Sequence, residues 1–118
     1  MHLRALALPS FITLAALTAA ACSSDSGETV KVTATNTACT PEKTTVPAKK
    51  VSFEVKNDGN DVTELYVQTK DDKVLGEVEN VGPGTSRKLT VTLRPGEYKL
   101  VCKPGQKGDG ITASVTAQ

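Results

Sequence analysis

The amino-acid sequence predicts an all-β domain, built as a Greek-key sandwich or small barrel of about seven strands. Three observations lead to this fold class. Beyond residue 28, apolar and polar residues alternate with a period of two in nearly every segment, as in strands that have one buried face. Turn-forming residues separate these segments. None of the segments keeps the i, i+3, i+4 apolar spacing of a helix.

Five strands can be identified from their apolar positions. In chain order, these positions are Val30 and Val32; Val51, Phe53 and Val55; Leu89, Val91 and Leu93; Tyr98, Leu100 and Cys102; and Ile111, Ala113 and Val115. The turns between segments are expected at residues 47–48, 57–60, 71–72, 82–84, 95–96 and 104–110. A further strand is expected to begin near Glu64, after the turn at 57–60.

The first 21 residues are typical of a secretory signal peptide. Arg4 is followed by an apolar or small-residue run from Ala5 to Ala21. A transmembrane anchor is the alternative, but this run contains a proline and falls short of the ~20 residues that span a bilayer. Alanines directly before Cys22, with a serine-rich stretch after it, resemble the lipobox of bacterial lipoproteins, in which the cysteine is acylated.

Acylation of Cys22 also accounts for the odd number of cysteines. The chain has 3 cysteines, and lipid on Cys22 leaves Cys39 and Cys102 as an even pair. Ordinary cleavage after the alanines is the alternative. We therefore expect a lipoprotein-type signal peptide over 1–21, a flexible tether over 22–28 and one domain over 29–118. The protein is expected to be exported, either lipid-anchored to the outer face of the cell membrane or periplasmic.

The charge balance argues against several function classes. Apart from Arg4 in the expected signal peptide, basic side chains equal the 13 acidic ones in number. A neutral domain lacks the basic footprint that nucleic-acid binding requires. An enzyme is not expected either, because the only histidine is His2 and no nucleophile motif or phosphate-binding loop occurs.

Three pairs of adjacent charged residues have ordinary structural interpretations. Asp71-Asp72 could be read as a carboxylate pair for acid–base chemistry, but a turn explains these residues better. Lys49-Lys50 and Arg87-Lys88 are interpreted as outward-facing strand ends that discourage edge pairing.

The segment LRPGEYKLVCKPGQ, residues 93–106, resembles the last hairpin of a cupredoxin, where a Pro-Gly turn feeds a strand that ends in a cysteine copper ligand. The segment VSFEVKNDG, residues 51–59, resembles the cupredoxin strand that precedes the first histidine ligand. The other ligand positions differ: they hold Thr63 or Glu64, Gln106, and Gly110 or Ile111. Because a type-1 copper site needs two imidazoles and a thiolate, a blue-copper electron carrier is not expected.

Five motifs occur in a fixed order: Cys39-Thr40-Pro41, Val46 to Lys50, Thr63 to Tyr66, Glu77 to Gly84, and Leu93 to Cys102. Together they resemble the cupredoxin-like domain of the EfeO family, extracytoplasmic components of bacterial iron-uptake systems. The resemblance covers about residues 29–117 and departs at Tyr66, where the family has a glutamate. The larger imelysin-type domain of that family has no counterpart in this sequence, so we expect a stand-alone domain.

This resemblance implies a metal site formed by Cys39, Cys102 and Glu64, and a possible second, oxygen-rich site that includes Glu77 and Glu79. Thiolates favour Cu(I) and clustered carboxylates favour ferric iron, so copper or iron is the implied ligand. A disulfide between the two cysteines is the alternative in an exported domain. For the glutamates, the alternative is a solvated strand face.

The resulting hypothesis is a membrane-tethered, extracytoplasmic metal-binding module that acts in iron uptake or metal handling. Its expected partners are the membrane, through the lipid anchor, and an iron-uptake permease or imelysin-type protein in trans. The alternative is a metal-free β-sandwich, stapled by a disulfide, that binds a partner protein.

The position of Cys102 provides a geometric expectation. Tyr98 and Leu100 are expected to face the core, and strand alternation then turns Cys102 inward as well. The resemblance implies that Cys39 and Glu64 meet Cys102 at one pole of the sandwich. A disulfide further requires Cα atoms about 4.4–6.8 Å apart.

Overall fold

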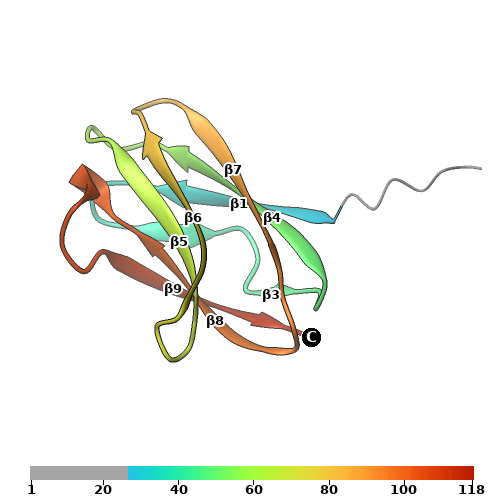
Figure 1. Ribbon diagram of the computed structural model, residues 1–118. Helices are drawn as coiled ribbons and strands as arrows, with labels where there is room; N and C mark the ends of the chain where they lie inside the picture. The colour runs from blue at the N-terminus through green and yellow to red at the C-terminus, as the bar shows by residue number, and fades with distance from the viewer. Residues whose placement is uncertain (1–26) are drawn as a thin grey trace, which may run out of the picture.

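The computed structural model describes residues 27–118, which form two β-sheets packed face to face (Figure 1). The predicted signal peptide, Cys22 and most of the predicted tether lie outside the described residues. Residues 27–118 contain one short 3-10 helix, Pro104–Gln106, and nine strands: β1 Glu28–Ala34, β2 Cys39–Pro41, β3 Thr45–Val46, β4 Lys50–Asn57, β5 Thr63–Thr69, β6 Val74–Val81, β7 Ser86–Thr92, β8 Gly96–Cys102 and β9 Ile111–Ala117. The prediction of an all-β sandwich is confirmed. In this part of the chain, no helix is long and apolar enough to cross a membrane.

The strands form a four-stranded sheet in the order β2-β1-β4-β7 and a five-stranded sheet in the order β3-β9-β8-β5-β6. β1 runs parallel to β4 and β3 runs parallel to β9, while the other pairs are antiparallel. β6 packs beside β7, where the two sheets meet. Gly76 permits this approach, because a Cβ at that position would lie 3.0 Å from Cγ1 of Val91 and 3.1 Å from Cδ1 of Leu89.

Alternating apolar residues fill the space between the sheets, as expected from the sequence. The largest fully buried side chains include Phe53, Leu65, Leu93 and Leu100. Each carries roughly 1.5–3 kcal/mol of burial free energy. β2 and β3 were not expected, because strands of three and two residues are too short to show an alternation. β1 begins at Glu28, one residue before the expected start of the domain.

The prediction that Lys49-Lys50 guards a sheet edge is wrong. Lys50 begins β4, and β4 lies between β1 and β7 in the four-stranded sheet, so it has no free edge to protect. The same interpretation suits Arg87 and Lys88, because β7 is an edge strand. The Arg87 guanidinium also donates a hydrogen bond to the backbone carbonyl of Glu79 in β6 (2.6 Å). This bond links β7 and β6, which are edge strands of the two sheets.

Asn57, at the end of β4, fastens the loops at one end of the sandwich. Its side chain is buried, with the residue only 1% exposed. The side-chain amide donates hydrogen bonds to the carbonyls of Asp61 (2.7 Å) and Val81 (2.8 Å), and its oxygen accepts one from the Gly59 N–H (2.9 Å). One side chain therefore satisfies three backbone groups that would otherwise lack partners.

Replacing Asn57 with alanine is expected to lower the free energy of unfolding by about 2–4 kcal/mol, because buried backbone groups lose their partners. Urea denaturation measures this loss. Asn60→Ala is the matched control, since Asn60 is exposed, and a change within about 0.5 kcal/mol is expected there. Equal effects of the two substitutions would show that Asn57 has no such role.

Candidate functional site

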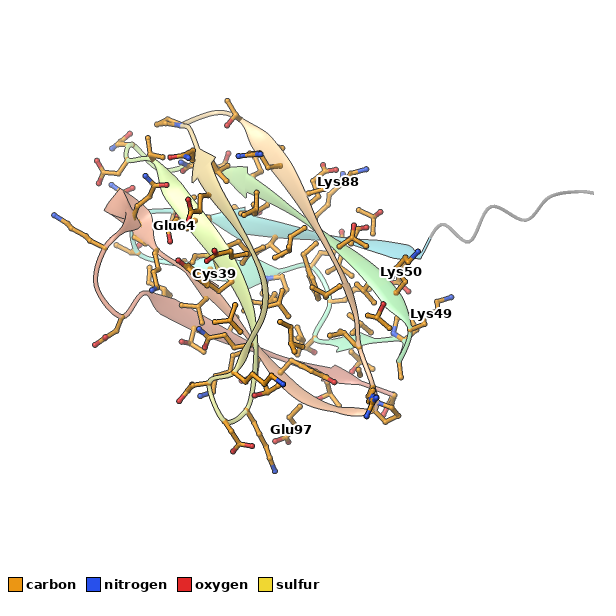
Figure 2. The ribbon with its side chains drawn as sticks, in the orientation of Figure 1. Cys39, Lys49, Lys50, Glu64, Lys88 and Glu97 are labelled. Carbon is orange, nitrogen blue, oxygen red and sulfur yellow. A yellow bond between two sulfur atoms is a disulfide. The ribbon has the colours of Figure 1, made fainter. Side chains whose placement is uncertain are left out.

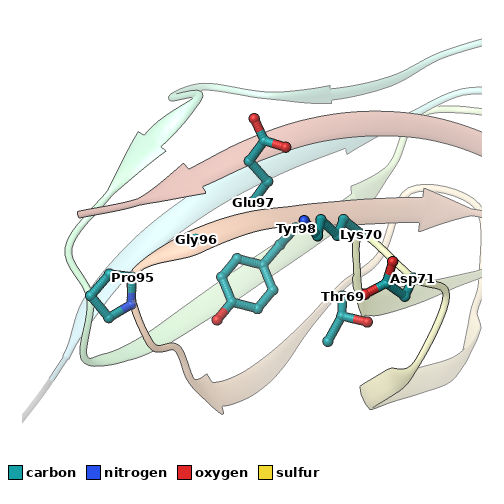
Figure 3. Close-up of a pocket in the computed structure, with 7 residues that line it drawn as sticks. All are labelled: Thr69, Lys70, Asp71, Pro95, Gly96, Glu97 and Tyr98. Carbon is teal, nitrogen blue, oxygen red and sulfur yellow. The ribbon is translucent and has the colours of Figure 1, made fainter.

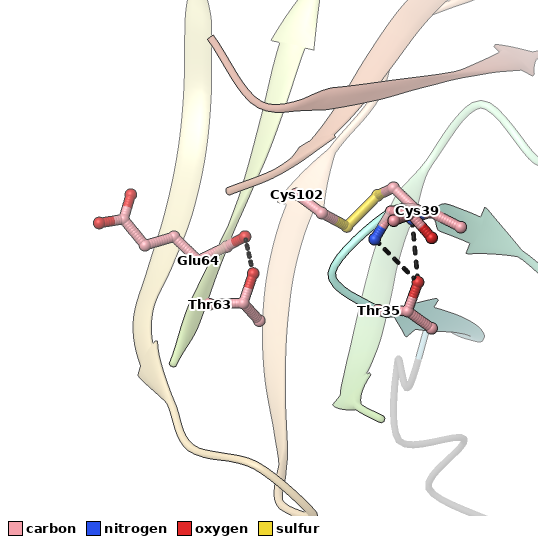
Figure 4. The surroundings of a disulfide bond; sticks show 7 residues. Thr35, Cys39, Thr63, Glu64 and Cys102 are labelled. Carbon is pink, nitrogen blue, oxygen red and sulfur yellow. Dashed lines mark hydrogen bonds between the residues drawn. A yellow bond between two sulfur atoms is a disulfide. The ribbon is translucent and has the colours of Figure 1, made fainter. Parts of the chain in front are cut away.

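Cys39 and Cys102 form a disulfide bond that joins the two sheets (Figure 4). Cys39 begins β2 of the four-stranded sheet, and Cys102 ends β8 of the five-stranded sheet. Their Cα atoms are 5.6 Å apart, although 63 residues separate them in sequence. Both residues are buried, so the prediction that Cys102 faces the core is confirmed. Of the two expectations for this cysteine pair, a metal site or a disulfide, the structure shows the disulfide.

The turn before Cys39 is shaped by the hydroxyl of Thr35 (Figure 4). This hydroxyl accepts hydrogen bonds from the backbone N–H groups of Thr37 (3.2 Å) and Ala38 (2.9 Å). Such a threonine turn reverses the chain, and it brings Cys39 opposite Ala34 in the β1–β2 hairpin. The local sequence thereby places the first sulfur at the rim of the core.

Glu64 lies on β5, beside β8, but faces the other side of that sheet. Its neighbour Leu65 pairs with Cys102 and is fully buried. Successive strand residues face opposite sides, so Glu64 points away from the core. Figure 4 shows its carboxylate directed away from the disulfide. The structure therefore brings the two cysteines together but does not bring the Glu64 carboxylate to them.

Glu64 instead belongs to a set of side chains on the outer face of β5 and β6. We call this set the outer carboxylate group: Glu64, Tyr66, Glu77 and Glu79. The Tyr66 hydroxyl donates a hydrogen bond to Oε2 of Glu64 (2.6 Å), and Tyr66 pairs with Glu77 across the strands. The register then shifts, so that Glu79 and Asn80 both lie opposite Glu64. The three glutamates named from the sequence thus occupy adjoining positions.

The members of this group differ in their surroundings. Glu64 is only 8% exposed, whereas Glu77 and Glu79 are exposed. None of the ion pairs within residues 27–118 involves any of the three. A buried carboxylate without a paired cation is uncommon, because desolvation of the charge is costly.

Lys103 lies next to this group, and the pKa of Tyr66 within it is raised. The Lys103 ammonium lies over the Tyr66 ring, 4.5 Å from its centroid. The hydrogen bond to Glu64, burial and the negative charges of Glu64 and Glu77 raise the pKa of Tyr66 well above its usual value. Tyr66 is therefore held protonated and acts as a donor to Glu64.

Gln106, which the sequence resemblance sets at the place of a histidine ligand, links two loops. Its Oε1 accepts a hydrogen bond from the Asn80 N–H (2.8 Å). Both residues have positive φ values, 52° for Gln106 and 56° for Asn80, which few residues other than glycine and asparagine adopt. Cys102 is in a disulfide and Gln106 is engaged in this bond. The donor set therefore does not fit a type-1 copper centre.

Sequence reasoning identified the glutamates but missed Tyr66 and Lys103 as their neighbours. Tyr66 could have been found, because it lies two residues after Glu64 and hence on the same strand face. Lys103 could not, since its place depends on the register between β5 and β8. Within the part of the chain that the structure describes, no three His, Cys, Asp or Glu side chains are grouped closely enough to hold a metal ion.

A separate depression of about 430 Å³ lies near the opposite end of β8, around Tyr98 (Figure 3). The Tyr98 hydroxyl donates a hydrogen bond to the Arg94 carbonyl (2.7 Å), which closes the β7–β8 turn. The depression is lined by Thr69, Lys70, Asp71, Pro95, Gly96, Glu97 and Tyr98. It contains neither cysteine and none of the three glutamates, so it is distinct from the site named from the sequence.

Comparison with known protein families gives a match over most of the chain. A family model of the cupredoxin-like domain matches residues 6–113. The iron uptake system component EfeO of Escherichia coli strain K12 is 41% identical over 73 residues, which cover 62% of this chain and 19% of that protein. The EfeO protein of Shigella flexneri matches to the same extent. The chain therefore spans about a fifth of the length of these relatives.

Two solved structures have the same fold. Auracyanin from Roseiflexus castenholzii superimposes with a TM-score of 0.61 at 17% identity, covering 78% of this chain and 98% of that one. Auracyanin A from Chloroflexus aurantiacus, a blue copper protein, gives a TM-score of 0.56 at 11% identity, covering 79% and 100%. At these identities the similarity concerns the fold alone.

Replacing both Cys39 and Cys102 with alanine is expected to lower the free energy of unfolding by roughly 4 kcal/mol, because the cross-link restricts the unfolded chain. Chemical denaturation under oxidising conditions measures the difference. A reductant should destabilise the wild type by a similar amount and leave the variant unchanged. A variant as stable as the oxidised wild type would contradict this account.

Tyr66→Phe is expected to change how stability depends on pH. The folded-state pKa of Tyr66 lies above its ordinary value of 10.0, so the stabilisation is fully present below about pH 10 and is lost as pH rises further. Wild-type stability should therefore fall more steeply than that of Tyr66→Phe above about pH 10. Thermal denaturation at several pH values checks this. Parallel pH profiles for the two proteins would rule out the proposed hydrogen bond.

Proposed function

The chain belongs to the cupredoxin-like family, and from this premise we propose that it is an extracytoplasmic metal-binding module with an accessory role in iron uptake or metal handling. In this proposal the domain is exported and is tethered to the outer face of the cell membrane by a lipid on Cys22. It is not a type-1 copper electron carrier. Its partner is an iron-uptake permease or an imelysin-type protein that acts in trans.

The buried carboxylate of Glu64 is the single observation that carries the proposal. It receives a hydrogen bond from Tyr66, yet it is not among the ion pairs of residues 27–118. Glu77 and Glu79 lie on β6, opposite Tyr66 and Glu64 respectively, and their side chains are exposed. Carboxylate oxygens are the donors that a hard ion such as ferric iron prefers. Iron, as the cargo, is therefore the expected ligand of the outer carboxylate group.

The cysteine pair supports a second mode of metal binding that depends on redox state. In the disulfide the sulfurs are not thiolates and do not act as strong ligands. Reduction yields two thiols on Cα atoms 5.6 Å apart, and thiolates favour Cu(I). The Cys39, Cys102 and Glu64 set implied by the resemblance requires Glu64 to be recruited from the other face of the sheet, so the two thiols alone are the simpler copper site.

A role in iron uptake is supported by the likeness to EfeO, which is named as a component of such a system. The matched part of that protein is only 19% of its length. The activity and partners of the whole relative therefore enter this proposal as expectations for the present chain.

The second candidate function is a metal-free interaction module. The disulfide favours it, because a covalent staple between two sheets stabilises a small core without any metal. The two candidates differ in what loss of the cysteines does. The interaction module loses stability and has no metal affinity to lose, whereas the metal module loses Cu(I) binding.

Isothermal titration with ferric citrate, Cu(II) and Cu(I), on oxidised and reduced protein, tests the proposal. Glu64→Gln is expected to weaken ferric binding at least tenfold, because it removes one charged oxygen donor. The matched control is Glu97→Gln, an exposed carboxylate near the opposite end of the molecule (Figure 2), where a change below about twofold is expected.

The double variant Cys39→Ser/Cys102→Ser should lose Cu(I) binding and keep ferric binding if the two sites are separate. If no metal binds with a Kd below roughly 100 μM in either redox state, the metal-binding function is abandoned in favour of the interaction module.

A further inference from the structure

Three exposed cationic residues lie near one another along the backbone where the chain enters the domain: Lys49, Lys50 and Arg94. Lys50 pairs with Thr92 on β7, and the Lys49 carbonyl accepts a hydrogen bond from the Leu93 N–H (3.0 Å). These two contacts bring Lys49 and Lys50 beside Arg94. Gly27 packs directly against Lys50, since a Cβ on Gly27 would lie 2.0 Å from the Lys50 carbonyl oxygen. We call these three residues the basic end.

The basic end is not explained by the fold. Lys50 begins a strand that has a neighbour on each side, so no sheet edge needs its charge. Four other lysines, Lys43, Lys56, Lys88 and Lys99, are in ion pairs within residues 27–118, and none of those pairs includes the basic end. The nearby acidic residue Glu28 is paired with Lys43. Three exposed positive charges therefore remain at this end.

The basic end and the outer carboxylate group lie towards opposite ends of the sandwich. β4 starts at Lys50 and ends at Asn57, whose side chain binds the loop that leads into Thr63 and Glu64. Figure 2 shows Lys49 and Lys50 beside the start of β1, with Glu64 and Cys39 towards the other end of the molecule. The basic end and the predicted ligands therefore lie apart on the molecule.

We propose that Lys49, Lys50 and Arg94 form a surface that binds anionic phospholipid headgroups and turns the outer carboxylate group away from the membrane. This inference builds on the membrane tether of the proposed function. The five residue-to-residue steps from Cys22 to Gly27 span at most about 18 Å, so a lipid on Cys22 holds the basic end close to the bilayer. Each cation near an anionic surface strengthens its binding about fivefold, within the range of a Debye length of about 8 Å.

The test is lysine acetylation of the full chain on vesicles, with a water-soluble reagent and mass-spectrometric readout. Vesicles of phosphatidylcholine alone are compared with vesicles that contain about 30% phosphatidylglycerol. Lys49 and Lys50 should react at least about fivefold more slowly on the anionic vesicles, while Lys31 and Lys107 should react equally on both. About 0.5 M salt should restore the reactivity of Lys49 and Lys50.

Two outcomes overturn the inference: equal reactivity of Lys49 and Lys50 on both vesicles, or equal protection of Lys31 and Lys107. The proposed tether is judged separately, by whether the chain stays on the neutral vesicles and whether the peptide containing Cys22 carries acyl mass. Loss of that retention, with protection on the anionic vesicles intact, refutes the tether and keeps the lipid-binding surface.

Matched charge variants separate this surface from net charge. The triple variant Lys49→Gln/Lys50→Gln/Arg94→Gln is compared with Lys31→Gln/Lys88→Gln/Lys107→Gln, both in a full chain with Cys22→Ser. Co-sedimentation with the anionic vesicles should weaken roughly a hundredfold in the first variant and by less than about tenfold in the second. Equal weakening in both variants would show that only total charge matters and would refute the proposal.

Discussion

The pairing of Leu65 with Cys102, across β5 and β8, decides which way each candidate ligand faces. Leu65 and Cys102 both point into the core, so the disulfide forms between the sheets. Glu64, one residue earlier, must then point outward. A single register thereby separates the two kinds of donor: sulfur lies inside the sandwich and carboxylate oxygen lies outside it.

A disulfide and several hydrogen bonds hold together the end of the molecule that contains Cys39 and Cys102. The disulfide joins the two sheets, Asn57 fastens three backbone groups, and Gln106 links its loop to Asn80. Each of these bonds is local and needs no metal. The described residues thus have a cupredoxin-like fold without the donor set of a type-1 copper centre.

The outer carboxylate group and the basic end lie towards opposite ends of the domain. Glu64, Tyr66, Glu77 and Glu79 lie on β5 and β6, while Lys49, Lys50 and Arg94 lie near the point where the chain enters. Because β4 runs the length of the sandwich, the two features are held apart by a rigid strand.

The sequence by itself determined the fold class and most of the strands, because alternation and turn residues are local signals. Val51, Phe53 and Val55, or Tyr98, Leu100 and Cys102, reveal their buried face without any partner strand. The candidate residues Cys39, Cys102, Glu64, Glu77 and Glu79 were also identified from the sequence alone. The sequence did not reveal β2 or β3, which are too short for a pattern.

Only the tertiary structure decided which residues meet. The neighbours of Glu64 depend on the register of β5 against β6 and β8, which involves residues far apart in the chain and a shift near Glu79. The interpretation of Lys49-Lys50 likewise depends on the order of strands. At a sheet edge this pair would serve to prevent edge pairing, but β4 lies between β1 and β7 and has no free edge. Strand order and register arise from packing across the whole sandwich, and a period of two along one strand carries no information about either.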